Sequence, residues 1–89
     1  MVPESEDEIR RKRLRYRAWH RGMKEMDLIL GQFADARLAG MSEAELADFE
    51  TIIACPDVAL YRWVTGAEPV PAQYDSALLR AVCAAAVKM

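Results

Sequence analysis

The sequence predicts an all-α protein, a small antiparallel bundle of about five helices. Over its 89 residues, apolar side chains recur mainly at spacings of three and four, the period of an amphipathic helix. Ser-x-x-Glu capping boxes at Ser5 and Ser42 mark two helix starts. No segment alternates apolar and polar residues as a half-buried strand would. Short connections between the helical segments favour antiparallel neighbours.

The first helix is expected to start at Ser5 and to run to about His20. Its apolar residues form a narrow stripe among arginines: Ile9, Leu14, Tyr16, Ala18 and Trp19. We therefore expect a mostly solvent-facing helix that is held by a few large side chains, with Tyr16 and Trp19 as core anchors.

Gly22 is expected to end the first helix and to act as N-cap of the second, because glycine is tolerated at both positions. This would place Glu25 at the third helical position, where a carboxylate interacts favourably with the helix dipole. The second helix should span about residues 23–39 and bury one apolar face: Met26, Ile29, Leu30, Phe33 and Leu38. Gly31 within it weakens the helical signal slightly.

The third helix should begin after Ser42, end at Ala54 and bury Leu46, Phe49 and Ile53. The Cys55-Pro56 pair breaks the helical pattern, since proline disfavours a helical residue before it. These two residues therefore separate the third helix from a fourth.

Asp57 is the expected N-cap of the short fourth helix, which should cover residues 58–65 and end at Gly66. Residues 67–71 contain two prolines and have the composition of a loop. A fifth helix is expected from about residue 73, with Tyr74, Leu78, Ala81 or Val82, and Ala85 along one side.

Composition indicates a single helical domain over residues 1–89, with residues 1–5 expected to be flexible. Hydrophobic residues make up 53% and charged residues 29%, the balance of a globular protein with enough apolar surface to bury. The acidic N-terminal segment resembles neither a secretory signal nor a basic transit peptide. No apolar stretch reaches the length of a membrane span, so we expect a cytoplasmic protein without direct membrane insertion.

The two cysteines and the one histidine do not suggest a metal or redox centre. Cys55 and Cys83 are far apart in sequence, and a cytosolic setting disfavours a disulfide, so two buried thiols are expected. His20 has no nucleophile or acid partner near it in the sequence and is interpreted as a surface residue. A module that binds metal through these residues is a remote alternative.

Charge is distributed unevenly along the chain. Residues 9–24 carry eight basic and no acidic side chains, whereas residues 25–89 carry four basic and ten acidic ones. Such a run could steer the protein toward an acidic partner or could bind the phosphates of a nucleic acid. The domain is acidic overall and lacks a helix-turn-helix or an aromatic stacking pattern, so a regulator that binds DNA or RNA through residues 9–24 remains the alternative hypothesis.

The seam between the first two helices holds Arg21, Gly22 and Glu25. A glycine at a helix end can adopt the left-handed conformation, which would cost other residues about 1–2 kcal/mol. An arginine before it and a glutamate three residues after it would place opposite charges around bare backbone, an arrangement that suits contact with another protein. Helix capping alone also explains these three residues.

Three stretches, taken in order, resemble the succinate dehydrogenase FAD-assembly factor family. They are Arg21-Gly22-Met23-Lys24-Glu25-Met26-Asp27, which matches an Arg-Gly-x-x-Glu signature, Asp48-Phe49-Glu50 through Cys55-Pro56-Asp57, and Leu60-Tyr61-Arg62-Trp63-Val64-Thr65-Gly66. The similarity covers about residues 10–66. A lone Arg-Gly-x-x-Glu is common, but three segments at family-like spacing are specific.

The resemblance implies an assembly chaperone that is not itself an enzyme. It would bind the flavoprotein subunit of succinate dehydrogenase, and in bacteria also that of fumarate reductase, and promote covalent attachment of FAD to a histidine of that subunit. No cofactor would be held stably by the chaperone, which we expect to be a monomer when free.

The family motifs place the partner contact at Arg21, Gly22 and Glu25, with Asp57 and Trp63 as further candidates. Trp63 is equally consistent with a core anchor and with an interface residue, because both environments favour large aromatic side chains.

Overall fold

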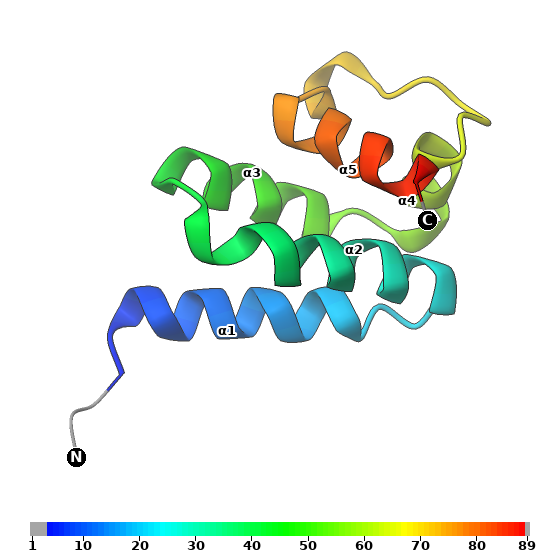
Figure 1. The fold of residues 1–89 in the computed structure, drawn as a ribbon. Coiled ribbons are helices and arrows are strands. Elements are labelled where there is room, and N and C mark those ends of the chain that lie inside the picture. Colours follow the sequence, from blue (N-terminus) through cyan, green and yellow to red (C-terminus); the bar gives the residue numbers. More distant parts are fainter. Residues whose placement is uncertain (1–3, 89) are drawn as a thin grey trace.

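In the computed structural model, which describes residues 4–88, the chain forms five α-helices and two short 3-10 helices (Figure 1). In chain order these are α1 (Glu6–Trp19), α2 (Lys24–Arg37), η1 (Leu38–Gly40), α3 (Glu43–Ala54), α4 (Asp57–Val64), η2 (Ala72–Tyr74) and α5 (Ala77–Val87). No strand occurs in this described part, which confirms the predicted all-α class. Of the segment predicted to be flexible, residues 1–3 lie outside the described residues.

The helices surround one core. Figure 1 shows α1 and α2 antiparallel and side by side, while α5 packs against α2, α3 and α4. The largest fully buried side chains come from four of the five helices: Met26, Leu30, Leu46, Phe49, Ile53, Leu60, Leu79 and Val82. The first helix adds only Leu14 and Ala18 as buried residues, so it lies on the outside of the bundle as predicted.

Serine caps start three of the helices. The Ser5 hydroxyl accepts from the Glu8 backbone N–H at 3.1 Å, and Ser76 caps α5 in the same way. At Ser42 the predicted capping box is complete, because the Glu45 carboxylate also accepts from the Ser42 backbone N–H at 3.1 Å. Each cap satisfies a backbone donor that the helix itself leaves unpaired.

Several predicted boundaries are wrong by one to four residues. The N-cap of α2 is Met23 and not Gly22, so Glu25 is the second helical residue, still within the first turn. The fourth helix begins at Asp57 with Pro56 as its N-cap, and α5 begins at Ala77 because residues 72–74 form a separate 3-10 helix.

Tyr16 and Trp19 were both predicted to anchor the core, but neither side chain is fully buried. Tyr16 is 65% exposed and stacks on His20 with ring centroids 4.0 Å apart, so the prediction is wrong for Tyr16. Trp19 is half-buried and lies over Gly31 of α2, where an added Cβ atom would come within 2.2 Å of the indole Cδ2. The absence of a side chain at Gly31 therefore leaves room for the Trp19 ring. This allows α1 and α2 to approach closely.

Arginines hold α1 to the rest of the bundle. Arg10 pairs with Glu43 at 2.5 Å and also with Glu50, both on α3. Arg11 donates to the backbone carbonyl oxygens of Leu38 at 2.5 Å and of Met41 at 2.9 Å. These contacts join α1 to α3 and to the segment around η1, in addition to the few apolar contacts of its narrow stripe.

Among the described residues, none of the helices has both the length and the apolar character needed to cross a bilayer.

Candidate protein-docking surface

The corner between α1 and α2 presents Gly22 to solvent. Its φ is +96°, in the left-handed region, and an ideal Cβ built on it meets no atom within 4 Å. The glycine is thus needed for its backbone conformation and is not fixed by crowding from the bundle. A partner can reach this backbone directly, as the sequence hypothesis requires.

Arg21, next to Gly22, is directed into the molecule. Its side chain is only 10% exposed. The Nε atom donates to Asp57 Oδ1 at 2.7 Å, and the terminal nitrogens donate to the backbone oxygens of Cys55, at 2.6 Å, and of Ile53. All three guanidinium nitrogens are therefore used within the chain. They satisfy carbonyl groups at the end of α3 and bind the first residue of α4.

Asp27 holds the corner from the other side. Its Oδ1 atom accepts from the backbone N–H of Arg21 at 2.5 Å, across the turn that contains Gly22. Sequence reasoning did not assign this role to Asp27. The available signal was a carboxylate in the first turn of α2, which can reach back to an unpaired donor as in a capping box. The corner is consequently fixed at both ends of its short loop.

Glu25 projects outward from the first turn of α2. It is exposed, and within residues 4–88 it forms no ion pair with another side chain. The three signature residues therefore separate into two groups. Gly22 and Glu25 are accessible from outside, whereas Arg21 is occupied by internal contacts.

The structure brings Asp57 to this site and places Trp63 in the core. Asp57 is half-buried through its ion pair with Arg21. Trp63 is 8% exposed and packs against Tyr74 with ring centroids 5.4 Å apart, so it occupies one of the two environments that the sequence left open. Partner contacts for these two residues stay predictions, and little of either side chain is accessible for them.

Most cations of the basic segment are paired. Lys12 pairs with Glu4 and Arg15 with Asp35 at 2.6 Å, in addition to the contacts of Arg10, Arg11 and Arg21. Among residues 4–88 the cations of this segment without an ion pair are Arg13, Arg17 and Lys24. The pairing leaves few free charges for phosphates and disfavours a nucleic-acid interface on α1.

The pKa values of the acidic partners reflect this pairing. A hydrogen bond from Arg10 lowers the pKa of Glu50, and hydrogen bonds from Arg15 and Trp19 lower that of Asp35. Both carboxylates thus remain charged at neutral pH and available for their ion pairs with α1.

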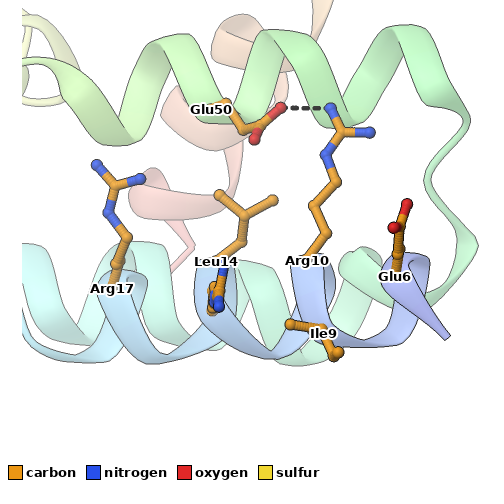
Figure 2. Close-up of a pocket in the computed structure, with 7 residues that line it drawn as sticks. Glu6, Ile9, Arg10, Leu14, Arg17 and Glu50 are labelled. Atoms are coloured by element: carbon orange, nitrogen blue, oxygen red, sulfur yellow. Dashed lines mark hydrogen bonds and ion pairs between the residues drawn. The ribbon is translucent and has the colours of Figure 1, made fainter. Parts of the chain in front are cut away.

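A groove of about 540 Å³ lies between α1 and α3, and Figure 2 shows Arg10 pairing with Glu50 across it. Leu14 lies between Arg10 and Arg17 in this view. The charged lining of the groove consists of three arginines and two glutamates, and Arg10 and Glu50 already pair with each other. We assign no function to it.

The cysteines are free, as predicted, but only Cys55 is fully buried, whereas Cys83 is half-buried. Burial raises the pKa of both thiols, so they are protonated and unreactive near neutral pH. Within the described residues no three histidine, cysteine or acidic side chains gather as metal ligands. His20 is exposed at the end of α1, as predicted.

Comparisons with known proteins agree on one family. Residues 12–86 match the family model described as flavinator of succinate dehydrogenase. The chain is 39% identical over 79 residues to the FAD assembly factor SdhE of Acetobacter pasteurianus, which covers 89% of this chain and 72% of the relative. It is 35% identical over 78 residues to the mitochondrial succinate dehydrogenase assembly factor 2 of Dictyostelium discoideum, covering 88% of this chain and 55% of the relative.

A third relative is the mitochondrial succinate dehydrogenase assembly factor 2-B of Drosophila persimilis. It is 35% identical over 80 residues, which cover 88% of this chain and 51% of the relative. The chain thus spans about half the length of these two mitochondrial relatives. Because the family model covers most of the chain and the bacterial relative is matched over most of its own length, this protein belongs to the family of succinate dehydrogenase flavinators.

Proposed function

We propose that the protein binds the flavoprotein subunit of succinate dehydrogenase and promotes covalent attachment of FAD to it. The observation that carries this proposal is the exposed, left-handed Gly22 at a corner that Arg21 and Asp27 hold in place. The match to the flavinator family and the names of the relatives support this choice of partner.

The protein acts by binding and not by chemistry of its own. It binds more tightly to the state of the flavoprotein in which FAD and the acceptor histidine are aligned, since a binder with equal affinity for all states would shift nothing. Alignment of two reacting groups itself accelerates their reaction, because it removes the entropic cost of bringing them together. The flavin stays with the partner throughout, and bond formation takes place there.

Each signature residue has its own part in this mechanism. Gly22 permits close approach of the two backbones, and the exposed Glu25 carboxylate forms charge-assisted contacts with the partner. Arg21 acts as a positioning residue, because its guanidinium holds the corner to the ends of α3 and α4.

Further parts of the sequence hypothesis belong to the proposal. The fumarate reductase flavoprotein is a second client, the free protein is a monomer, and the encounter takes place in the cytoplasm.

The first test is Gly22→Arg, which adds a long side chain where the partner is expected to touch backbone. The variant should lose co-purification with the flavoprotein subunit and lower its covalent flavin, measured by fluorescence of the denatured subunit in a gel. Helical content by circular dichroism should stay near that of the original protein.

Two other glycines provide matched controls. Gly66 also has a positive φ, of 79°, and open space around it, so Gly66→Arg introduces the same backbone strain of about 1–2 kcal/mol at another place. Gly40 is exposed without that conformation, and Gly40→Arg should bind normally. If Gly22→Arg unfolds while Gly66→Arg stays folded, the glycine serves the fold and the docking role is wrong.

A further inference from the structure

Exposed apolar side chains gather on one face of the bundle. Leu28 of α2, Tyr61 of α4 and Val87 of α5 are 37%, 38% and 82% exposed, and Val58 lies one turn before Tyr61 on α4. In the described residues only Ile9 and Tyr16 are large apolar side chains of comparable exposure elsewhere. Single exposed apolar residues are ordinary, but a contiguous group from three helices is typical of an interaction site.

Of these side chains, Leu28, Tyr61 and Val87 line a groove of about 470 Å³ between α2, α4 and α5. Leu28 and Ile29 form one wall, Tyr61 and Val64 the other, and Val87 lies at the α5 side. We call this hollow the α2–α4–α5 groove. Its size is in the range that accommodates a few side chains of a bound ligand or peptide.

Within the part of the chain that the structure describes, Glu25 is the one charged residue that lines the α2–α4–α5 groove. It is also part of the corner that contains Gly22, three residues before it in the chain. The groove is therefore continuous with the proposed docking surface and carries a negative charge on an otherwise mainly apolar lining. A segment that fills it must bring apolar atoms and a compensating cation.

We propose that the α2–α4–α5 groove receives an apolar segment of the flavoprotein subunit in which a lysine or arginine adjoins the inserted side chains. The apolar side chains pack between Leu28 and Tyr61, and the cation pairs with the Glu25 carboxylate. This inference rests on the proposed function and extends the docking surface from the corner onto α4 and α5.

A second copy of this chain fits the groove less well. In a two-fold symmetric dimer both subunits use the same surface, which brings two Glu25 carboxylates to one interface. Among residues 4–88, no cation lines the groove to compensate them. Like charges in an interface of this kind oppose association, whereas a basic partner segment is attracted.

The test compares matched variants in binding to purified flavoprotein subunit that holds FAD non-covalently. Leu28→Ser and Tyr61→Ser should each weaken binding about tenfold, as expected for partly exposed anchors in an interface. Tyr16→Ser is the control, since Tyr16 is an exposed aromatic on α1 outside the groove, and its affinity should be unchanged. Thermal melting checks that all three variants are folded.

Glu25→Gln tests the charge separately. It should weaken binding and reduce the dependence of affinity on salt, because one ion pair is removed. A photo-crosslinker at position 87 should capture a flavoprotein peptide that contains a basic residue beside apolar ones.

The outcomes separate this inference from the function on which it rests. If Gly22→Arg abolishes binding while Leu28→Ser and Tyr61→Ser bind as the original protein does, the groove proposal is overturned and the function stands. Failure of the unmodified protein to bind the flavoprotein would refute both. If light scattering shows a dimer that Leu28→Ser dissociates, the groove serves self-association and our choice of occupant is wrong.

Discussion

At the scale of single residues, the internal contacts of Arg21 set the geometry of the exposed glycine beside it. The guanidinium joins the last carbonyl groups of α3 to the first residue of α4, and the backbone N–H of Arg21 itself donates to Asp27. A planar fork of this kind cannot be reproduced by lysine, whose ammonium is a single point charge. We therefore expect Arg21 to act mainly through the stability of the fold.

Substitution of Arg21 tests this interpretation. Arg21→Ala should lower the free energy of unfolding by about 2–4 kcal/mol, because it leaves Asp57 and two carbonyl groups without their donor. Arg21→Lys should cost about 1–2 kcal/mol. Urea titration measures both, with Glu25→Gln as a control expected within about 0.5 kcal/mol of the original protein. Loss of binding by an Arg21→Lys variant of unchanged stability would instead show that Arg21 touches the partner.

At the scale of secondary-structure elements, the contact between α1 and α2 depends on Trp19 over Gly31. The indole lies where a side chain at position 31 would otherwise be. Replacement of glycine by alanine within a helix normally stabilises it by about 1 kcal/mol. Overpacking a filled contact costs about 1–3 kcal/mol, so the steric effect should exceed the gain in propensity here.

Gly31→Ala is thus expected to lower the melting temperature, against the usual trend for helices. The matched control is Gly40→Ala, since nothing lies within 4 Å of a Cβ at Gly40. If the clash is the cause, combining Gly31→Ala with Trp19→Leu should destabilise less than the sum of the two single changes. A Gly31→Ala protein that melts higher than the original would contradict the packing that we describe.

At the scale of the whole molecule, ion pairs attach the basic helix α1 to the acidic remainder. Arg10 and Arg15 lower the pKa of Glu50 and Asp35, so these carboxyls bind a proton more readily in the unfolded chain than in the folded one. Stability contributed in this way is present above the ordinary carboxyl pKa and is lost as pH falls through the lowered one.

Acid titration should therefore weaken the protein below about pH 4. We expect the urea midpoint to be nearly constant from pH 7 to pH 5 and to fall as the pH drops through about 4. Arg10→Gln should reduce this fall, because it returns the Glu50 pKa toward its ordinary value. If the pH profile is the same with and without Arg10, the ion pair between Arg10 and Glu50 does not contribute to the pH dependence of stability.

Association kinetics should depend on the cations that structure leaves unpaired. Arg13 and Arg17 form no ion pair within residues 4–88, so both can be neutralised without detaching α1. The double variant Arg13→Gln/Arg17→Gln should slow association with the flavoprotein at low salt and bind at the original rate at high salt. Stopped-flow measurements at two ionic strengths compare the rates, and equal rates at low salt would exclude steering by these residues.

The sequence was sufficient for features that depend on near neighbours. Ser42 and Glu45 form the predicted capping box, because both lie within one helical turn. Gly22 is exposed with a positive φ, as its place between two helices suggested. Periodicity could not decide which side of the narrow α1 stripe faces inward, so the prediction for Tyr16 was wrong.

Features that depend on residues far apart in the chain could not be predicted from the sequence. Arg21 and Asp57 are separated by 36 positions, and nothing local indicates that they pair. From the sequence, Gly31 only weakened the helical signal of α2. The need for a glycine there comes from Trp19, which lies on another helix. The α2–α4–α5 groove combines single exposed residues of three helices, none of which departs from its own helical pattern.

The opposite orientations of Arg21 and Gly22 have a consequence for genetics. Inherited or selected changes at Arg21, Asp57 or Asp27 should reduce the cellular abundance of the protein, because unfolded chains are degraded. Changes at Gly22 or Glu25 should leave abundance much less affected and impair the encounter with the client. Two alleles in one short signature could then cause the same deficiency by different routes, and only the first kind would respond to a small molecule that stabilises the fold.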